Sequence, residues 1–323
     1  MNCCHEVTNE DGQGKSWSES AGEGTAGQAP DVRLILHRGF YLIPGVNSPV
    51  VVDQIQNWEI RDSDIFLITY PKSGTIWMQQ IIILIEAKGN AMATAGKPNC
   101  ERMPWIEVKG SEETFLQAPL SSPRLSVTHL PYRLLPVGLR QKKAKIIYVA
   151  RNPKDALVSY YHFHHFAAVL ETPKDFNDFF EKFMDGRVYG NTWFEHIKAY
   201  YSHKDEMNIL YVTYEDMIQD LRSVVEKVCS FLDRELTDSQ MASVVEHARF
   251  NNMVRNPSAN YRQVSATLLN QQRGSFMRKG TVGDWKNLFS VAQSERFDKV
   301  FQEEMTDVPL SFKWDLKEVS PSG

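Results

Sequence analysis

Residues 65–77 read Ile-Phe-Leu-Ile-Thr-Tyr-Pro-Lys-Ser-Gly-Thr-Ile-Trp, and this segment is the most informative in the chain. An apolar, β-branched run over 65–69 stops before Pro71, a short polar turn follows, and 76–85 is an apolar run of helical length. A strand, a tight polar turn and a helix form a cradle for phosphate, because a helix N-terminus presents free N–H groups and partial positive charge to an anion. The stretch therefore predicts an anion site in the turn.

The turn carries the donors that such a site needs. The backbone N–H groups of Ser73, Gly74 and Thr75 open the helix, Lys72 adds a full charge, and the two hydroxyls add donors. The alternative is an ordinary buried turn, since Gly and Ser are common turn residues. The Walker A pattern Gly-x-x-x-x-Gly-Lys-Ser/Thr is not matched, which disfavours an ordinary ATP or GTP site.

Composition narrows the class of protein. A chain of 323 residues allows one large α/β domain or two small ones, and a net charge of −4 gives no general sign of nucleic-acid binding. The four cysteines lack Cys-x-x-Cys spacing, and the N-terminus lacks a signal-peptide pattern. We therefore expect free thiols and a cytoplasmic location. The apolar run at 81–85 is too short to span a bilayer, so we expect no membrane partner.

Residues 1–29 differ from the rest of the chain. They are rich in Gly, Ser, Glu, Thr and Gln, and such a segment buries too little surface to offset its ordering entropy. We predict a disordered tail over 1–29 and a folded domain over 30–323. Adjacent Cys3 and Cys4 are expected to be unmodified thiols, with lipidation as the alternative, and Asn2 excludes N-myristoylation.

Strands and helices alternate from residue 31 onward. The runs at 145–150 and 208–213 are typical of strands, whereas apolar residues recur with helical spacing over 176–183 and 224–232. This alternation predicts an α/β fold with a central parallel sheet flanked by helices, whose ligands lie at the carboxyl ends of the strands. The 72–75 turn, Arg151 and Tyr214 each follow a predicted strand.

Three blocks of sequence, in this order, resemble the cytosolic sulfotransferase family. They are the segments 70–77, 148–160 and 276–287. The resemblance covers about residue 31 to the end and is nearest to the amine sulfotransferase branch. It implies a single α/β domain with a P-loop-like strand-loop-helix. It also implies sulfuryl transfer from 3′-phosphoadenosine 5′-phosphosulfate (PAPS), without a metal, to the hydroxyl or amine of a phenol, steroid or aromatic amine.

The resemblance also implies a nucleotide site. The first loop would hold the 5′-phosphate, and Arg151, Ser159, Arg278 and Lys279 would hold the 3′-phosphate, which suits the forked donors of a guanidinium. Trp77 and Phe250 would stack on the two faces of adenine, with Tyr214 in contact. The complete implied set is Lys72, Ser73, Gly74, Thr75, Ile76, Trp77, Arg151, Ser159, Tyr214, Phe250, Met253, Phe276, Met277, Arg278, Lys279 and Gly280.

Catalysis is implied for two residues. His129, in Thr-His-Leu-Pro, matches the family's general base, and Lys72 would stabilise charge on the bridging and leaving oxygens. The rate is expected to rise with pH through a group near the ~6.5 reference value of histidine, shifted by its surroundings. Trp105 and Phe163 would line the acceptor pocket, with His164 nearby.

The chain departs from the family pattern at two places. Val127 stands where many members have Lys, and Ala248-Arg249 replaces Thr-Ser, so Arg249 either substitutes for a hydroxyl contact or faces solvent. The segment Lys286–Glu295 resembles a short dimer motif, with Ser290 for Thr, and predicts a weak homodimer. A non-catalytic nucleotide-binding protein and a kinase-like phosphotransferase stay open as alternatives.

Overall fold

The computed structural model describes residues 33–119, 123–141 and 144–315. The predicted tail over 1–29, with Cys3 and Cys4, lies outside these residues. The strands are β1 (Ile35–His37), β2 (Phe40–Leu42), β3 (Ile65–Thr69), β4 (Leu125–Thr128), β5 (Lys145–Ala150) and β6 (Asn208–Thr213). The α-helices are α1 (Pro49–Ile55), α2 (Thr75–Glu86), α3 (Asn99–Arg102), α4 (Ser111–Leu116), α5 (Pro153–His164), α6 (Phe176–Met184), α7 (Trp193–Ser202), α8 (Tyr214–Gln219), α9 (Leu221–Leu232), α10 (Asp238–His247), α11 (Phe250–Arg255) and α12 (Val291–Glu304). Short 3-10 helices are η1 (Ala91–Thr94), η2 (Tyr132–Leu134), η3 (Val137–Arg140), η4 (Lys204–Glu206) and η5 (Asp284–Asn287).

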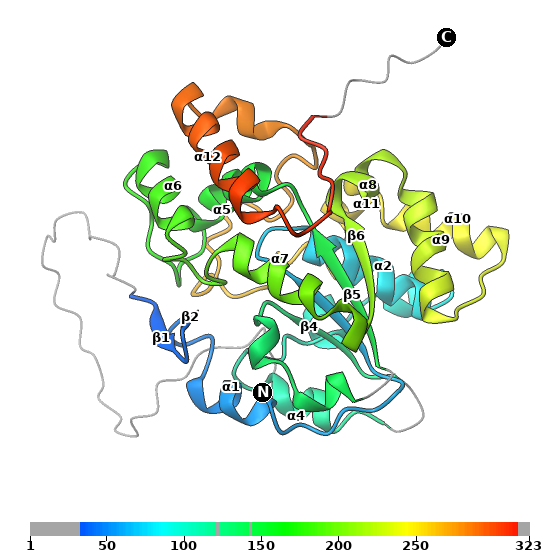
Figure 1. Ribbon diagram of the computed structural model, residues 1–323. Helices are drawn as coiled ribbons and strands as arrows, with labels where there is room; N and C mark the ends of the chain where they lie inside the picture. The colour runs from blue at the N-terminus through cyan, green and yellow to red at the C-terminus, as the bar shows by residue number, and fades with distance from the viewer. Residues whose placement is uncertain (1–32, 120–122, 142–143, 316–323) are drawn as a thin grey trace, which may run out of the picture.

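A four-stranded parallel sheet forms the centre of the molecule (Figure 1). Its strand order is β4-β3-β5-β6, and Ile65 of β3 lies opposite Leu125 on one side and Lys145 on the other. A separate antiparallel hairpin pairs β1 with β2. The predicted α/β fold with a parallel sheet is confirmed.

Alternation along the strands creates a hydrophobic core on each face of the sheet. Phe66 and Ile68 of β3 pack with residues of α5, α6, α7 and α12, whereas Ile65 and Leu67 pack with α2, α9 and α10. Successive side chains of a strand point to opposite faces, so β3, in which every residue is buried, is covered by helices on both sides.

The helices begin where the sequence predicts. Asn152 caps α5 by accepting the N–H of Asp155, with Pro153 at the first helical position. The apolar stripes predicted over 176–183 and 224–232 lie in α6 and α9 and face the core. Gly74 precedes α2 with φ of 101°, a conformation that favours glycine.

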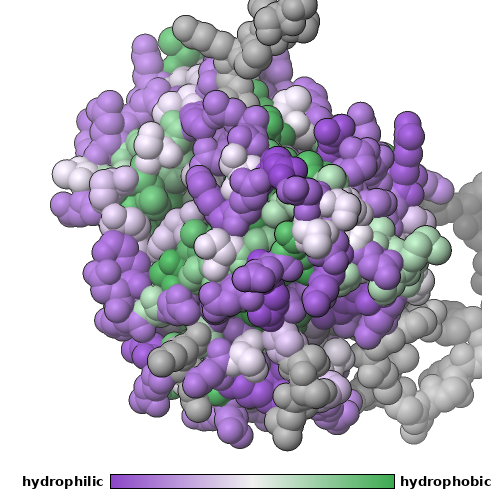
Figure 2. All heavy atoms as spheres, turned by 90° about the vertical axis from the view of Figure 1, so that its right-hand side faces the viewer, coloured by the Kyte–Doolittle hydropathy of each residue, from purple (hydrophilic) through white to green (hydrophobic). Residues whose placement is uncertain are grey.

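The carboxyl ends of the four parallel strands collect the polar residues singled out from the sequence. Strand β3 ends at residue 69, shortly before the 72–75 turn. Strands β4, β5 and β6 end at residues 128, 150 and 213, and the next residues are His129, Arg151 and Tyr214, respectively. On the face seen in Figure 2 the surface is mostly hydrophilic, with separate hydrophobic patches between the polar residues. Among the described residues, no helix has both the length and the apolar character needed to cross a membrane.

Candidate functional site

A cavity of about 280 Å³ opens at this edge of the sheet and brings together most of the predicted site. Its wall contains residues from the strand ends, from α2 and α5, and from the 276–281 loop. The predicted residues that line it are Lys72, Gly74, Thr75, Ile76, Trp77, Trp105, His129, Arg151, Ser159, Phe163, Tyr214, Phe250, Met253, Phe276, Met277, Arg278, Lys279 and Gly280.

Two predicted residues do not line the cavity. Ser73 is fully buried in the turn. The imidazole of His164 is buried beside Tyr160 and Phe179, and its Nδ1 lies 2.8 Å from the carbonyl oxygen of Glu171. His164 therefore packs in the core next to the cavity instead of facing it.

Lys72 lies between two aromatic rings. It adopts φ of 68°, and its Nζ is 4.2 Å from the ring centroid of Phe163 and 4.3 Å from that of Phe276. Burial lowers the pKa of Lys72 to about 7, with further lowering from the charges of Arg151 and Arg278. An anion beside the ammonium group would favour its charged form.

Arg151 holds the turn and the 276–281 loop together. Its guanidinium donates to the carbonyl oxygens of Lys72 at 3.2 Å and Thr281 at 3.3 Å, and stacks 4.1 Å from the ring of Tyr214. The Nε of Arg151 and the hydroxyl of Ser73 are buried without a hydrogen-bond partner among the described residues. Buried donors are normally paired, so these two would suit an oxyanion.

Two glycines let aromatic rings approach the backbone. A Cβ on Gly74 would lie 2.8 Å from the ring of Tyr214, and one on Gly280, where φ is 67°, would lie 2.6 Å from the ring of Phe250. Trp77 is fixed by a 2.7 Å hydrogen bond from its Nε1 to the carbonyl oxygen of Ala248. These rings form the aromatic part of the cavity wall.

His129 is held in one tautomer. Its Nδ1 lies 2.6 Å from the carbonyl oxygen of Thr69, which can only accept, so Nδ1 carries the proton and Nε2 the lone pair. The backbone N–H of His129 donates to the carboxylate of Glu107 at 2.8 Å. Its carbonyl accepts from His196 Nε2 at 3.2 Å. Burial lowers the pKa of His129 to about 3, so the ring is a neutral base at pH 7.

The structure adds residues that the sequence motifs missed. Tyr189 lines the cavity and donates from its hydroxyl to Glu107 at 2.9 Å. Tyr261 also lines it, accepts from Trp105 Nε1 at 3.3 Å and donates to Gln79 at 2.8 Å. Neither tyrosine belongs to a periodic pattern, and a single aromatic residue in a loop carries no signal of its contacts.

The two departures from the family pattern have different surroundings. Val127 is fully buried in β4, and its carbonyl accepts from the N–H of Ile106 at 3.0 Å. It supplies no group to the cavity. Arg249 lies at the surface in an ion pair with Glu246, so it faces solvent and replaces no contact in the cavity.

A metal centre receives no support from the part of the chain that the structure describes. There, no three or more His, Cys, Asp or Glu residues gather closely enough to hold a metal ion. His162 and His165 both lie on or just after α5 without such a set.

Comparisons with known proteins show what this chain is similar to. The sulfotransferase domain family matches residues 62–309. An amine sulfotransferase of Oryctolagus cuniculus is 46% identical over 274 residues, which cover 84% of this chain and 90% of that protein. A 3-alpha-hydroxysteroid sulfotransferase of Cavia porcellus is 40% identical, covering 83% and 93%. The crystal structure of mouse sulfotransferase SULT7A1 complexed with PAP matches with a TM-score of 0.71 at 30% identity, covering 85% of this chain and 96% of that one.

Proposed function

The chain belongs to the sulfotransferase family, and from that premise we propose that it moves a sulfuryl group from PAPS to a neutral, hydrophobic hydroxyl or amine acceptor. One observation carries the proposal. A single cavity holds a cluster of cations, one of which, Arg151, has a buried Nε without a hydrogen-bond partner among the described residues, and with them a histidine whose free Nε2 is a neutral base.

The sulfuryl donor, PAPS, would occupy the half of the cavity that is lined by the cationic side chains. The 72–75 turn at the start of α2 fits the 5′-phosphate, because the unpaired hydroxyl of Ser73 and the ammonium of Lys72 lie there. Arg151, Ser159, Arg278 and Lys279 fit a second phosphate. The aromatic residues Trp77, Tyr214 and Phe250 fit the adenine ring. The PAP complex of the mouse relative supports this assignment.

In the proposed reaction, His129 Nε2 takes the proton of the acceptor while the acceptor oxygen or nitrogen bonds to sulfur. Lys72 stabilises the negative charge that develops on the departing phosphate oxygen as its bond to sulfur breaks. The carbonyl of Thr69 keeps Nδ1 protonated, so it directs basicity to Nε2 throughout. The catalytic step thus depends on positioning and charge.

The acceptor side of the cavity favours neutral molecules. Among the described residues that line the cavity, none is Asp or Glu, so no carboxylate is available for an alkylammonium group. Apolar side chains from several loops form this wall, namely Ile43, Val46, Val108, Val264, Leu268 and Leu269. A phenol, a steroid or an aromatic amine therefore suits the wall better than an alkylamine. The relatives named above include an amine sulfotransferase and a 3-alpha-hydroxysteroid sulfotransferase.

Assembly and location belong to the same proposal. Val291 begins α12 with its side chain 75% exposed, and Lys286 pairs with Asp315 at the surface. An exposed valine at a helix start suits pairing with a second copy across a two-fold axis. A cytoplasmic location stays a prediction.

Calorimetry followed by an activity assay tests the function. The protein is expected to bind 3′-phosphoadenosine 5′-phosphate far better than adenosine 5′-phosphate, and Arg278→Ala is expected to lose about 1.5–3 kcal/mol of the binding free energy. Turnover is then measured with PAPS and a panel of a phenol, a steroid, an aromatic amine and an alkylamine. Equal affinity for the two nucleotides would contradict the donor assignment. Bisphosphate binding without turnover of any acceptor would favour the non-catalytic alternative.

A further inference from the structure

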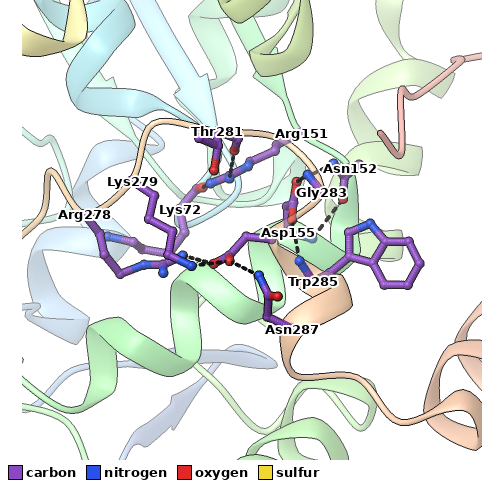
Figure 3. A network of polar contacts seen from close by, with 11 residues as sticks. Lys72, Arg151, Asn152, Asp155, Arg278, Lys279, Thr281, Gly283, Trp285 and Asn287 are labelled. Carbon is purple, nitrogen blue, oxygen red and sulfur yellow. Dashed lines mark hydrogen bonds and ion pairs between the residues drawn. The ribbon is translucent and has the colours of Figure 1, made fainter. Parts of the chain in front are cut away.

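The two cations expected to bind the second phosphate already share a buried anion. Arg278 Nη2 contacts the carboxylate of Asp284, and Lys279 Nζ lies 2.5 Å from its Oδ1. Asn287 Nδ2 donates to the same Oδ1 at 2.8 Å. The Asp284 side chain is only 5% exposed, whereas those of Arg278 and Lys279 are 27% and 48% exposed. In Figure 3 dashed lines from the labelled side chains of Arg278, Lys279 and Asn287 meet at one unlabelled carboxylate, which these contacts identify as that of Asp284.

The position of Asp284 is fixed by its backbone neighbours. The buried carboxylate of Asp155 accepts the N–H of Gly283 at 2.8 Å and the N–H of Trp285 at 2.9 Å. Asp155, labelled in Figure 3, lies in the first turn of α5. The same helix carries Ser159. The carboxylate of Asp284 is therefore anchored to the same helix as the subsite, whereas its partners reach it on long side chains.

Asp284 stays charged at any working pH. Burial alone would raise the pKa of its carboxyl group, but hydrogen bonds from Lys279, Arg278 and Asn287 outweigh burial and hold that pKa well below the ordinary range. Arg and Lys side chains only donate, and each N–H has one direction. An incoming phosphate must therefore compete with Asp284 for the same donors and meets a like charge nearby.

We propose that Asp284 is the resident counter-ion of the second phosphate subsite, which holds Arg278 and Lys279 until a phosphate takes them over. The inference rests on the proposed function, because it concerns the same 3′-phosphate subsite. Its consequence is selectivity: a nucleotide phosphate that also engages Arg151 and Ser159 displaces the carboxylate, and a free inorganic anion does not. Asp284 is thus a specificity residue that acts through the two cations.

Asp284→Asn tests the proposal, because it removes the charge and keeps the shape. The full-length variant and the wild type are titrated with 3′-phosphoadenosine 5′-phosphate and with adenosine 5′-phosphate, then with the bisphosphate in the presence of inorganic sulfate. We expect the variant to bind the bisphosphate about tenfold tighter, with unchanged affinity for the monophosphate, and sulfate to compete about tenfold more strongly. Equal or weaker bisphosphate binding by the variant would overturn the proposal.

Matched variants separate this role from a structural one. Asn287→Ala removes a neutral partner of the carboxylate and keeps its charge, so it should show no gain. In an Arg278→Ala background, Asp284→Asn should lose part of its gain, because Arg278 is one of the two cations through which the effect passes. If Asp284→Asn does not fold, the neutral Asp284→Ser replaces it in the same titrations. A wild type without preference for the bisphosphate refutes the proposed function, whereas an intact preference with no gain in the variant refutes only the role of Asp284.

Discussion

His129 enters the proposed reaction as a neutral imidazole, and this single residue determines the expected pH dependence. Because burial lowers its pKa to about 3, base activity would be lost only as the pH falls toward that value. The turnover number at saturating PAPS should therefore be flat between about pH 5.5 and 7.5 for an acceptor that does not titrate there. The sequence alone predicted a rise of the rate with pH through a group near the ~6.5 reference value of histidine, shifted by its surroundings, and burial shifts this group far below that value. A measured rise near the reference value would contradict the structure.

Substitution of the same residue separates chemistry from binding. His129→Asn keeps a donor for the carbonyl of Thr69 but removes the base, so turnover should fall by about 10²–10⁴ while nucleotide affinity stays within a few fold. Lys72→Ala is the contrasting variant, because Lys72 lies on the phosphate side and should affect both quantities. Steady-state kinetics and calorimetry on both variants check this, and wild-type turnover of His129→Asn would refute the assignment.

At the scale of an element, the first turn of α12 is expected to carry the subunit contact. Val291→Glu places a charge on the proposed interface and leaves the capping box of Ser290 and Gln293 intact, so the helix should still form. Sedimentation velocity should show a shift from dimer to monomer. The interface is expected to bury less than ~1,200 Å², which makes the wild-type dimer weak.

The control variant, Gln302→Glu, introduces the same negative charge at another position of α12. Gln302→Glu lies on the exposed side of the last turn of α12, distant in sequence from the first turn, and should sediment as the wild type does. Identical behaviour of Val291→Glu and the wild type would exclude this segment as the interface.

At the scale of the whole molecule, buried histidines should make the fold acid-sensitive. Burial lowers the pKa of His129 and His196 to about 3 and that of His164 to about 4. In the unfolded chain these histidines bind protons as the pH falls below ~6.5, whereas in the folded chain they stay neutral. The free energy of unfolding therefore decreases as the pH drops below that value, by up to about 1.4 kcal/mol per pH unit for each histidine. His164→Phe keeps an aromatic ring beside Tyr160. It should reduce the pH dependence of the free energy of unfolding by up to the contribution of one histidine.

Urea denaturation at several pH values between 5 and 7 measures the slope. His247→Gln is the control, because the His247 side chain is exposed on α10 and meets solvent in the folded protein as well. An unchanged slope for His164→Phe would show that this buried ring does not contribute to the acid sensitivity.

Patterns among neighbouring residues were enough to predict the backbone elements that form the site. The turn over 72–75, the proline at the start of α5 and the strand before Tyr214 each depend on neighbouring residues, and each lies where predicted. The resemblance to the family also assigned Arg278 and Lys279 to the same phosphate as Arg151, and all three line one cavity although 127 or more residues separate them. The residue patterns and the family resemblance were therefore sufficient to predict the fold class, the family and most of the cavity wall.

The surroundings of each of these groups, in contrast, depend on how distant segments pack together. His164 packs in the core although the neighbouring Phe163 lines the cavity, because adjacent residues of a helix point in different directions. The tautomer of His129 depends on Thr69, 60 residues away, and its pKa depends on burial by several segments. The pairing of Arg278 with Asp284 follows from hydrogen bonds that Asp155 makes across 128 and 130 residues. Burial, hydrogen-bond partners and charge environment are properties of packed segments, so no local pattern of residues encodes them.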